Sequence, residues 1–382
     1  MISGHAKGDP LTAAIMRSAD FAATHIATRP GLSGDRDFPW DLWKGMGGAG
    51  LLGIGIPGEY GGSGLGYPGI SGAGKALTRH GLCLGITLSW LMHQITSRFF
   101  LCSFVPDDLK RACLPAAAQG TVTFSIAISE PGVGGHPKYL KTSAERDGNG
   151  YVLHGEKTYL TNGPMADFFI VLAVSGQDGE RKRYGAFWVP RGCAGLAVTG
   201  PMDVGFLRPC MHGGIILNGC RVPGENLMGN SGTAYEDMAL PFRDVEDTAM
   251  MGPILGAQEA RFSEIAAALR ERGGPVSEET AFRLGGVGCS LVALDVLARE
   301  AACLLESDGP GGALQDLVLS FRNLYGQVHA EVEAIRVREG AQASGIYQAI
   351  SHDLDHIVRF AGRVSRVRQI KVGAGIVSAG EG

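Results

Sequence analysis

The sequence predicts an α+β protein of three parts: an N-terminal helical domain, a middle antiparallel β-domain and a C-terminal four-helix bundle. Apolar residues recur at helical spacing up to about residue 119, and the pattern changes to that of short strands from about 122 to 229. Helical spacing then returns. We therefore place the domains at residues 1–119, 120–230 and 231–382.

The N-terminal domain is predicted from two stretches with helical spacing of apolar residues, 11–27 and 82–102, with Gly- and Pro-rich loops between them. The middle domain is predicted from four short apolar runs, VTFSIAI, FFIVLAV, YGAFWVP and GGIILNGCRVP. Turn-forming segments such as DGNG and SGQDGERKR separate these runs, as expected for strands.

The bundle is predicted from four long segments with helical spacing, at residues 250–274, 282–306, 314–336 and from Ile346 onward. Four helices of this length, joined by short loops, indicate an up-and-down bundle.

Composition excludes several classes of protein. Hydrophobic residues make up 45% of the chain and charged residues 19%, which is typical of globular proteins. The net charge of −4 gives no reason to expect nucleic-acid binding. No apolar run reaches the roughly 18 residues that span a bilayer, so no membrane partner is expected. The N-terminus has no signal-peptide pattern, and the eight Cys residues form no CxxC pair, so we expect a cytoplasmic protein with reduced thiols.

We expect no metal. His352 and His356 stand one helical turn apart beside Asp353 and Asp355, and this is the only cluster of ligand-type residues. Such a pair can bind zinc when a third ligand is near. Because no HExxH glutamate accompanies it, a polar helix face is the simpler interpretation.

The most informative motifs lie at two strand ends. The first strand ends in Ser129-Glu130-Pro131-Gly132, and a later strand ends in Tyr159-Leu160-Thr161-Asn162-Gly163. Each end places a hydroxyl beside backbone that Gly or Pro forces to turn, and can present donors to a flat ring with polar edges. An ordinary β-sandwich hairpin is the alternative. The paired motifs resemble those of the acyl-CoA dehydrogenase family, and the similarity extends over nearly the whole chain.

The resemblance implies FAD as cofactor. Ile126, Ile128 and Ser129 fall where the family offers backbone and hydroxyl groups to the edge of the isoalloxazine ring. Tyr159 and Thr161 fall where an aromatic residue lies near the ring and a threonine reaches N5. The family's motif continues with Ser-Asp after E-P-G-x-G, where this chain has Gly135-His136, which is compatible with a carrier-bound substrate or an unusual CoA ester.

The family removes the α-proton of an acyl thioester with a carboxylate while the β-hydrogen leaves as hydride to flavin, so the base needs a dry pocket that raises its pKa. Most members carry this Glu in a C-terminal loop, but the matching segment here, Val372 to Val377, has Ala374. A branch similar to isovaleryl-CoA dehydrogenase supplies Glu from the first helix after the β-domain. The motif Asp244-Val245-Glu246-Asp247 matches that branch, so Glu246 is the predicted base. The alternative is that these acidic residues form the solvated start of a helix, where negative charge is favourable. The residue after the base is usually Arg in the family, and here it is Asp247.

The resemblance also implies two flavin contacts that a neighbouring subunit supplies. Arg270 stands at the Arg of the family's R-x-x-F-G motif, and Gln348 at the Gln of Q-x-x-G-G-x-G. Ser351 and His352 replace the two glycines of that motif and add bulk where bare backbone would approach a ligand.

These features predict an FAD-dependent α,β-dehydrogenase of an acyl thioester, either acyl-CoA or an acyl group on a carrier protein. The resemblance further implies an electron-transfer flavoprotein as acceptor and a homo-oligomer, a dimer or a homotetramer. Two alternatives stay open: a catalytically degenerate subunit paired with a paralogue, and an oxygen-using flavoenzyme on the same fold.

Overall fold

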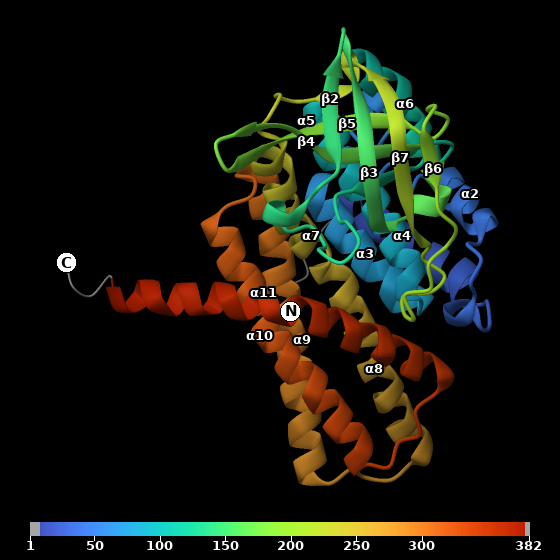
Figure 1. Ribbon diagram of the computed structural model, residues 1–382. Helices are drawn as coiled ribbons and strands as arrows, with labels where there is room; N and C mark the ends of the chain where they lie inside the picture. Colours follow the sequence, from blue (N-terminus) through green and yellow to red (C-terminus); the bar gives the residue numbers. More distant parts are fainter. Residues whose placement is uncertain (1–7, 379–382) are drawn as a thin grey trace.

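The computed structural model describes residues 8–378, apart from the side chains of 360–364, 375 and 378. It has the predicted architecture: N-terminal helices, a β-domain in the middle and a C-terminal helical bundle (Figure 1). The fold class predicted from the sequence is therefore confirmed.

The N-terminal helices surround one fully buried helix. They are α1 (Pro10–Phe21), α2 (Trp40–Gly48), α3 (Gly66–Gly81), α4 (Leu84–Ile95), α5 (Cys102–Phe104) and α6 (Asp107–Gln119). All residues of α4 are buried, and most of them are apolar. The side chain of Asp9 caps the start of α1 by accepting hydrogen bonds from the N–H groups of Leu11 and Thr12.

The β-domain is built around one sheet. Its strands are β1 (Phe124–Ala127), β2 (Ser143–Asp147), β3 (Gly150–Thr161), β4 (Phe168–Asp178), β5 (Arg181–Pro190), β6 (Leu196–Val198), β7 (His212–Pro223) and β8 (Leu227–Met228). Their order is β6-β7-β3-β2-β4-β5-β8, with β1 beside β4. The pairs β1–β4 and β2–β4 are parallel and the others antiparallel.

The two faces of the sheet pack against different cores, as the alternation along β4 shows. Ile170 and Leu172 join the large core shared with the helices, whereas Phe169 and Val171 join a smaller core inside the β-domain. A strand with both faces covered is apolar throughout, and this explains the run FFIVLAV in β4.

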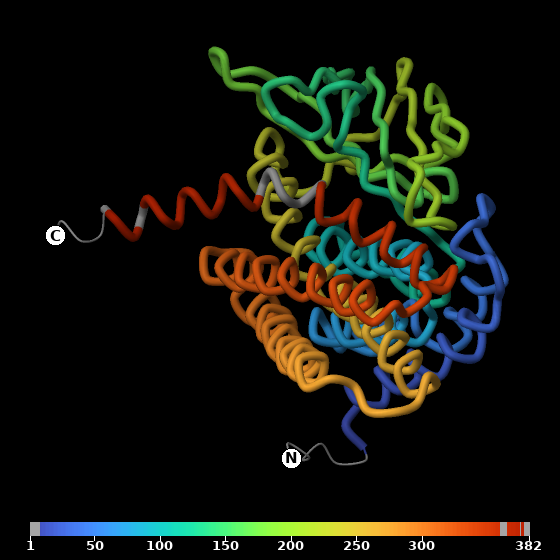
Figure 2. The backbone as a smooth tube through the Cα atoms, turned by 90° about the horizontal axis from the view of Figure 1, so that it is seen from below, coloured from blue at the N-terminus to red at the C-terminus, as the bar shows by residue number. Residues whose placement is uncertain are grey.

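The C-terminal helices are α7 (Leu240–Ala249), α8 (Met251–Arg272), α9 (Glu278–Ser307), α10 (Gly312–Arg338) and α11 (Gly345–Ser378). The four long predicted helices correspond to α8 through α11. α11 crosses beneath the β-domain, and its C-terminal end extends beyond the rest of the chain in both views (Figures 1 and 2).

One expectation about this region is wrong. Residues 372–377, which we matched to a loop of the family, belong to the last turns of α11. No proline interrupts the chain between Gly345 and Ser378, and isolated glycines such as Gly373 cost a helix only about 1 kcal/mol each.

By length and composition alone, α9 could cross a membrane, although no uninterrupted apolar run in the sequence predicts this. Core helices of water-soluble bundles meet the same criterion. In this fold α9 packs against α3, α8 and α10. Its exposed side nevertheless carries the apolar side chains of Phe282, Val292 and Val296.

Two thiols of the β-domain lie unusually close together. Cys193 follows β5 and Cys220 lies in β7, and their Sγ atoms are 3.1 Å apart. Cys193 is half-buried, whereas burial raises the pKa of the Cys220 thiol to about 12, so Cys193 should react first with an oxidant. We expect hydrogen peroxide to convert Cys193 to a sulfenic acid and Cys220 then to displace water from it, which forms a disulfide.

Peptide mapping by mass spectrometry would detect the linked pair, and Cys220→Ser is the control that should abolish it. Oxidation confined to the exposed thiols of Cys289 and Cys303, with Cys193 and Cys220 still free, would contradict this prediction.

Candidate functional site

The predicted strand-end residues come together around one hollow. It has a volume of about 230 Å³, and its lining includes five of the seven residues assigned to the flavin, together with the predicted base: Ile126, Ile128, Ser129, Tyr159, Thr161 and Glu246. The remaining wall includes apolar side chains that no sequence motif indicated, among them Met92 and Phe242. A lining that combines hydroxyl groups and strand-end backbone with a few apolar side chains fits a flat ring with polar edges, such as a flavin.

Two hydrogen bonds hold the two strand ends side by side. The N–H of Thr158 donates to the carbonyl of Ser129 at 2.9 Å, and the hydroxyl of Ser125 donates to the carbonyl of Thr161 at 2.7 Å. Tyr159 sits at an irregularity of β3 with φ of 58°, and 60% of its side chain is exposed. A positive φ is unusual for a bulky residue, and here it turns the ring away from the core of the sheet.

A buried ion pair fixes the backbone on both sides of Ser129. The ammonium group of Lys157 donates to the carbonyl of Ile128 at 3.0 Å and to the carboxylate of Glu130 at 2.9 Å. Burial lowers the pKa of Lys157 to about 8, although the charge of Glu130 opposes this. Burial works to raise the pKa of Glu130, but the charge of Lys157 and hydrogen bonds from Thr142 outweigh it, and the pKa is lowered.

Lys157 was not among the site residues predicted from the sequence. Alternation along β3 could have identified it, because Lys157 shares its phase with the buried residues Tyr151 and Leu153. A lysine that faces inward needs a carboxylate partner, and Glu130 stands directly after the strand-end serine.

Glu246 lies between this hollow and a larger cavity. The cavity has a volume of about 670 Å³, and Glu246 and Arg243 line both spaces. Its lining is largely apolar, with Met250, Met251, Ile254, Phe321, Tyr325 and Ile357 among its residues. Burial raises the pKa of Glu246 to about 7, and the charge of Asp247 adds to this, while Arg243 and Arg322 oppose it.

Asp247 lines the same cavity as Glu246. Its carboxylate accepts hydrogen bonds from Arg322 at 2.6 Å and from Arg368 at 3.2 Å. Arg368 also donates to Asp244 at 3.0 Å. Burial raises the pKa of Asp247 against the effect of both arginines. No motif pointed to Arg322 or Arg368, which reach α7 from α10 and α11.

Arg270 and Gln348 lie elsewhere in the chain. Arg270 is exposed in the last turn of α8. Gln348 lines a separate polar hollow of about 370 Å³ together with Arg261, Ser351 and His352. Neither appears among the described residues that line the two spaces beside Glu246. The roles assigned to them, as contacts to the flavin of a neighbouring subunit, stay predictions.

The His352–His356 segment has contacts within the fold. The ring of His352 hydrogen-bonds to the carbonyl of Gly205 at 3.0 Å, and Asp353 accepts from the N–H of Leu207 at 2.7 Å. These bonds join α11 to the loop that precedes β7. Within residues 8–378, no three or more His, Cys, Asp or Glu side chains are grouped closely enough to hold a metal ion.

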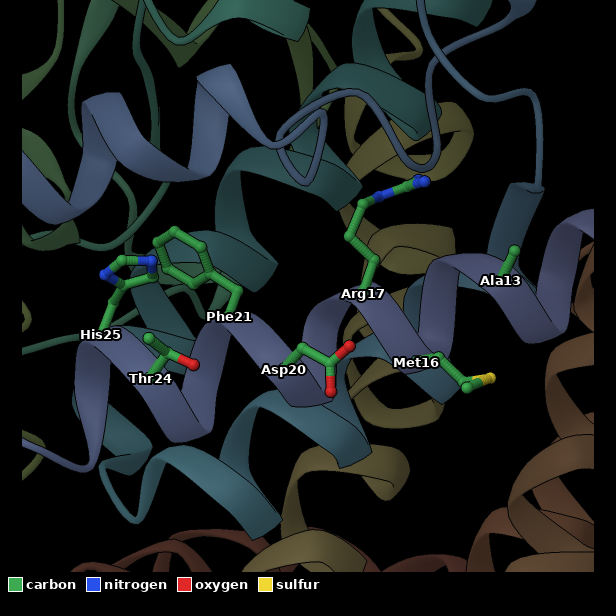
Figure 3. A pocket seen from close by; sticks show the side chains of 7 residues that line it. All are labelled: Ala13, Met16, Arg17, Asp20, Phe21, Thr24 and His25. Carbon is green, nitrogen blue, oxygen red and sulfur yellow. The ribbon is translucent and has the colours of Figure 1, made fainter.

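A further hollow, of about 520 Å³, lies along the outer side of α1 (Figure 3). All of its lining residues come from the segment between Ala13 and His25, and Arg17 and Asp20 are among them. It shares no lining residue with the spaces beside Glu246.

Comparisons with known proteins agree with this geometry. Two family models match: "Acyl-CoA dehydrogenase, N-terminal domain" over residues 13–121 and "Acyl-CoA dehydrogenase, middle domain" over residues 125–219. L-prolyl-(peptidyl-carrier protein) dehydrogenase of Pseudomonas fluorescens is 31% identical over 320 residues, which cover 80% of this chain and 81% of the relative.

Solved structures share the fold. Butyryl-CoA dehydrogenase from Megasphaera elsdenii superposes with a TM-score of 0.84 at 19% identity, covering 98% of this chain and 100% of the other. A glutaryl-CoA dehydrogenase from Mycobacterium smegmatis, solved in complex with FADH2, gives a TM-score of 0.78 at 20% identity and covers 92% and 90% of the two chains.

Proposed function

The chain belongs to the acyl-CoA dehydrogenase family of oxidoreductases, and from this premise we propose that it catalyses FAD-dependent α,β-dehydrogenation of an acyl thioester with Glu246 as the base. One observation supports the proposal above all others. Glu246 lies in the wall between the hollow that holds the predicted flavin contacts and the largely apolar cavity. A carboxylate in this position reaches an acyl group from one side and faces the flavin site across it.

Each side of Glu246 has a distinct role in this proposal. Bound FAD would supply the acceptor for the β-hydrogen, which leaves as hydride. Ser129 and Thr161 would hold the polar edge of the ring with their hydroxyl groups. The apolar side chains of Met250 and Ile254 would surround the acyl chain and exclude water. Glu246 would take the α-proton, and a pKa of about 7 suits a base that works near neutral pH.

We further propose the partners that the reaction needs. The thioester is carried on CoA or on a carrier protein, and the relative from Pseudomonas fluorescens is named for a carrier-bound substrate. Electrons pass to an electron-transfer flavoprotein. The chain assembles as a homo-oligomer, a dimer or a homotetramer, in the cytoplasm. The exposed apolar side of α9, with Phe282, Val292 and Val296, supports self-association, because such a surface is costly in water.

The experiment is to purify the chain, record its flavin absorbance and add acyl thioesters of CoA, pantetheine and a carrier protein without oxygen. We expect yellow protein that one class of thioester bleaches. The rate of bleaching should rise with pH through about 7, because Glu246 accepts a proton only when it is ionised.

A colourless, folded protein would favour the degenerate-subunit alternative. Bleaching that is equally fast at pH 5 and pH 8 would contradict the role of Glu246. Oxygen consumption without formation of the α,β-unsaturated thioester would favour the oxygen-using alternative.

A further inference from the structure

The C-terminal half of α11, with the turn before it, forms both a wall of the Glu246 cavity and an outward-facing surface. Ile357, Val358, Ser365, Arg366, Arg368 and Gln369 line the cavity. Beyond them the helix extends past the rest of the chain, as both views show (Figures 1 and 2). The bonds from Arg368 to Asp244 and Asp247 hold this half of the helix beside α7.

This part of α11 is strongly basic in a chain whose net charge is −4. Residues 356–378 include Arg359, Arg363, Arg366, Arg368 and Lys371 and contain no Asp or Glu. Arg368 is neutralised by its two carboxylate partners, whereas the side chains of Arg359, Arg366 and Lys371 are exposed.

Apolar residues are exposed among these cations. Val367 is 57% exposed and Ile370 is 62% exposed. We call Arg359, Arg366, Val367, Ile370 and Lys371 the distal α11 surface. Arg359 and Arg366 are seven residues apart, and Ile370 follows four residues later, so these three lie on one side of the helix.

The cavity beside this surface also has an excess of positive charge. Its lining includes four arginines, at positions 243, 322, 366 and 368, and two carboxylates, Glu246 and Asp247. Charge of one sign that continues from a cavity onto the adjoining surface attracts a ligand of opposite sign and speeds its association.

We propose that the distal α11 surface docks an acidic carrier protein, whose phosphopantetheine arm delivers the thioester into the cavity. This inference rests on the proposed function and chooses between the two carriers that it allows. A projecting helix cannot enclose a nucleotide, and exposed Val367 and Ile370 match a folded protein surface better than the phosphates of CoA. Paired basic and apolar side chains of this kind are typical of interfaces that charge steers and apolar contacts stabilise.

The first measurement is binding, which does not depend on turnover. A fluorescently labelled acyl carrier protein with its phosphopantetheine attached is titrated with the purified full-length enzyme, and anisotropy gives the dissociation constant. We expect Arg359→Glu/Lys371→Glu to weaken binding by about tenfold or more, since each reversal replaces attraction with repulsion. Added salt should weaken binding to the unmodified enzyme.

The matched control reverses two exposed cations on other helices, with Arg17→Glu on α1 (Figure 3) and Lys44→Glu on α2. Neither residue lines the Glu246 cavity, and this variant should bind the carrier protein as tightly as the unmodified enzyme. Equal loss in both double variants would show that only net charge matters and would overturn the docking surface.

Turnover provides the second measurement. The same acyl group is offered on the carrier protein and on pantetheine alone. The α11 variant should lose about tenfold or more in kcat/KM for the carrier-bound substrate and keep its activity on the pantetheine thioester.

Failure of the proposed function would appear differently, as carrier binding without bleaching by any thioester. The docking proposal is overturned if the unmodified enzyme does not bind the carrier protein. It is also overturned if the α11 variant still binds the carrier protein but no longer sediments with anionic phospholipid vesicles as the unmodified enzyme does. The helix would then bind a membrane surface.

Discussion

Glu246→Gln is expected to abolish the reduction of flavin by thioester while the protein stays folded and yellow. Glutamine has the shape of glutamate but accepts no proton, and general base catalysis contributes about a hundredfold to ten-thousandfold to a rate. Stopped-flow absorbance without oxygen would measure the loss. Because burial disfavours the ionised carboxylate, the variant should also be at least as stable to urea as the unmodified enzyme at pH 8.

The sign of this stability effect follows from the raised pKa. The folded chain holds the proton of Glu246 up to about pH 7, whereas the unfolded chain releases it near 4.5. Ionisation of Glu246 therefore opposes folding as pH rises through this window, and the glutamine variant is free of that cost. A variant that bleaches as fast as the unmodified enzyme would contradict Glu246 as the base, and one that unfolds at pH 8 would contradict the cause assigned to its pKa.

Asp247→Asn tests whether the residue next to Glu246 sets the pKa of that base. Its negative charge raises the pKa of Glu246, and its removal also leaves Arg322 and Arg368 less neutralised. Both effects lower the pKa of the base, so the pH profile of bleaching should move to lower pH, with activity retained. This shift separates a residue that tunes the base from one that takes the proton.

The domain layout could be predicted because apolar residues recur at a different spacing in the helical parts and in the β-domain. The strand-end residues could be predicted because their motifs are local in sequence. Ser129 follows β1 and Thr161 is the last residue of β3, and turn residues mark both strand ends, so their approach in space required only that β1 and β3 share a sheet. The position of Glu246 beside the strand-end hollow could be predicted from a pattern within one short helix, together with Ala374 at the alternative position, and its role as the base stays a prediction.

The remaining parts of the site depend on contacts between distant segments. Arg322 and Arg368 reach Asp247 from 75 and 121 residues away, and no local pattern encodes such a meeting. The path of α11 was missed because the family resemblance predicted a loop where the local sequence permits a helix. Gln348 and Arg270 were predicted to contact the flavin of a neighbouring subunit. A single chain does not show contacts between subunits.

Lys157→Met is expected to destabilise the β-domain and to loosen the flavin site together. The methionine leaves the Glu130 carboxylate buried without its cation, and removal of one partner from a buried ion pair costs about 3–5 kcal/mol. The carbonyl of Ile128 also loses its donor, so the backbone around Ser129 loses its attachment to β3. Urea unfolding would measure the stability, and FAD titration of the apoprotein would measure the affinity.

Two further variants separate the two effects. Lys110→Met breaks a surface ion pair with Asp107 and should cost less than about 1 kcal/mol. Glu130→Gln/Lys157→Met removes both buried charges and should recover much of the lost stability. Because the bond to the Ile128 carbonyl stays absent, FAD affinity in the double variant should remain weaker by about tenfold, roughly the 1.4 kcal/mol of one hydrogen bond. Full recovery of FAD affinity with stability would show that Lys157 supports the fold alone and does not position Ser129.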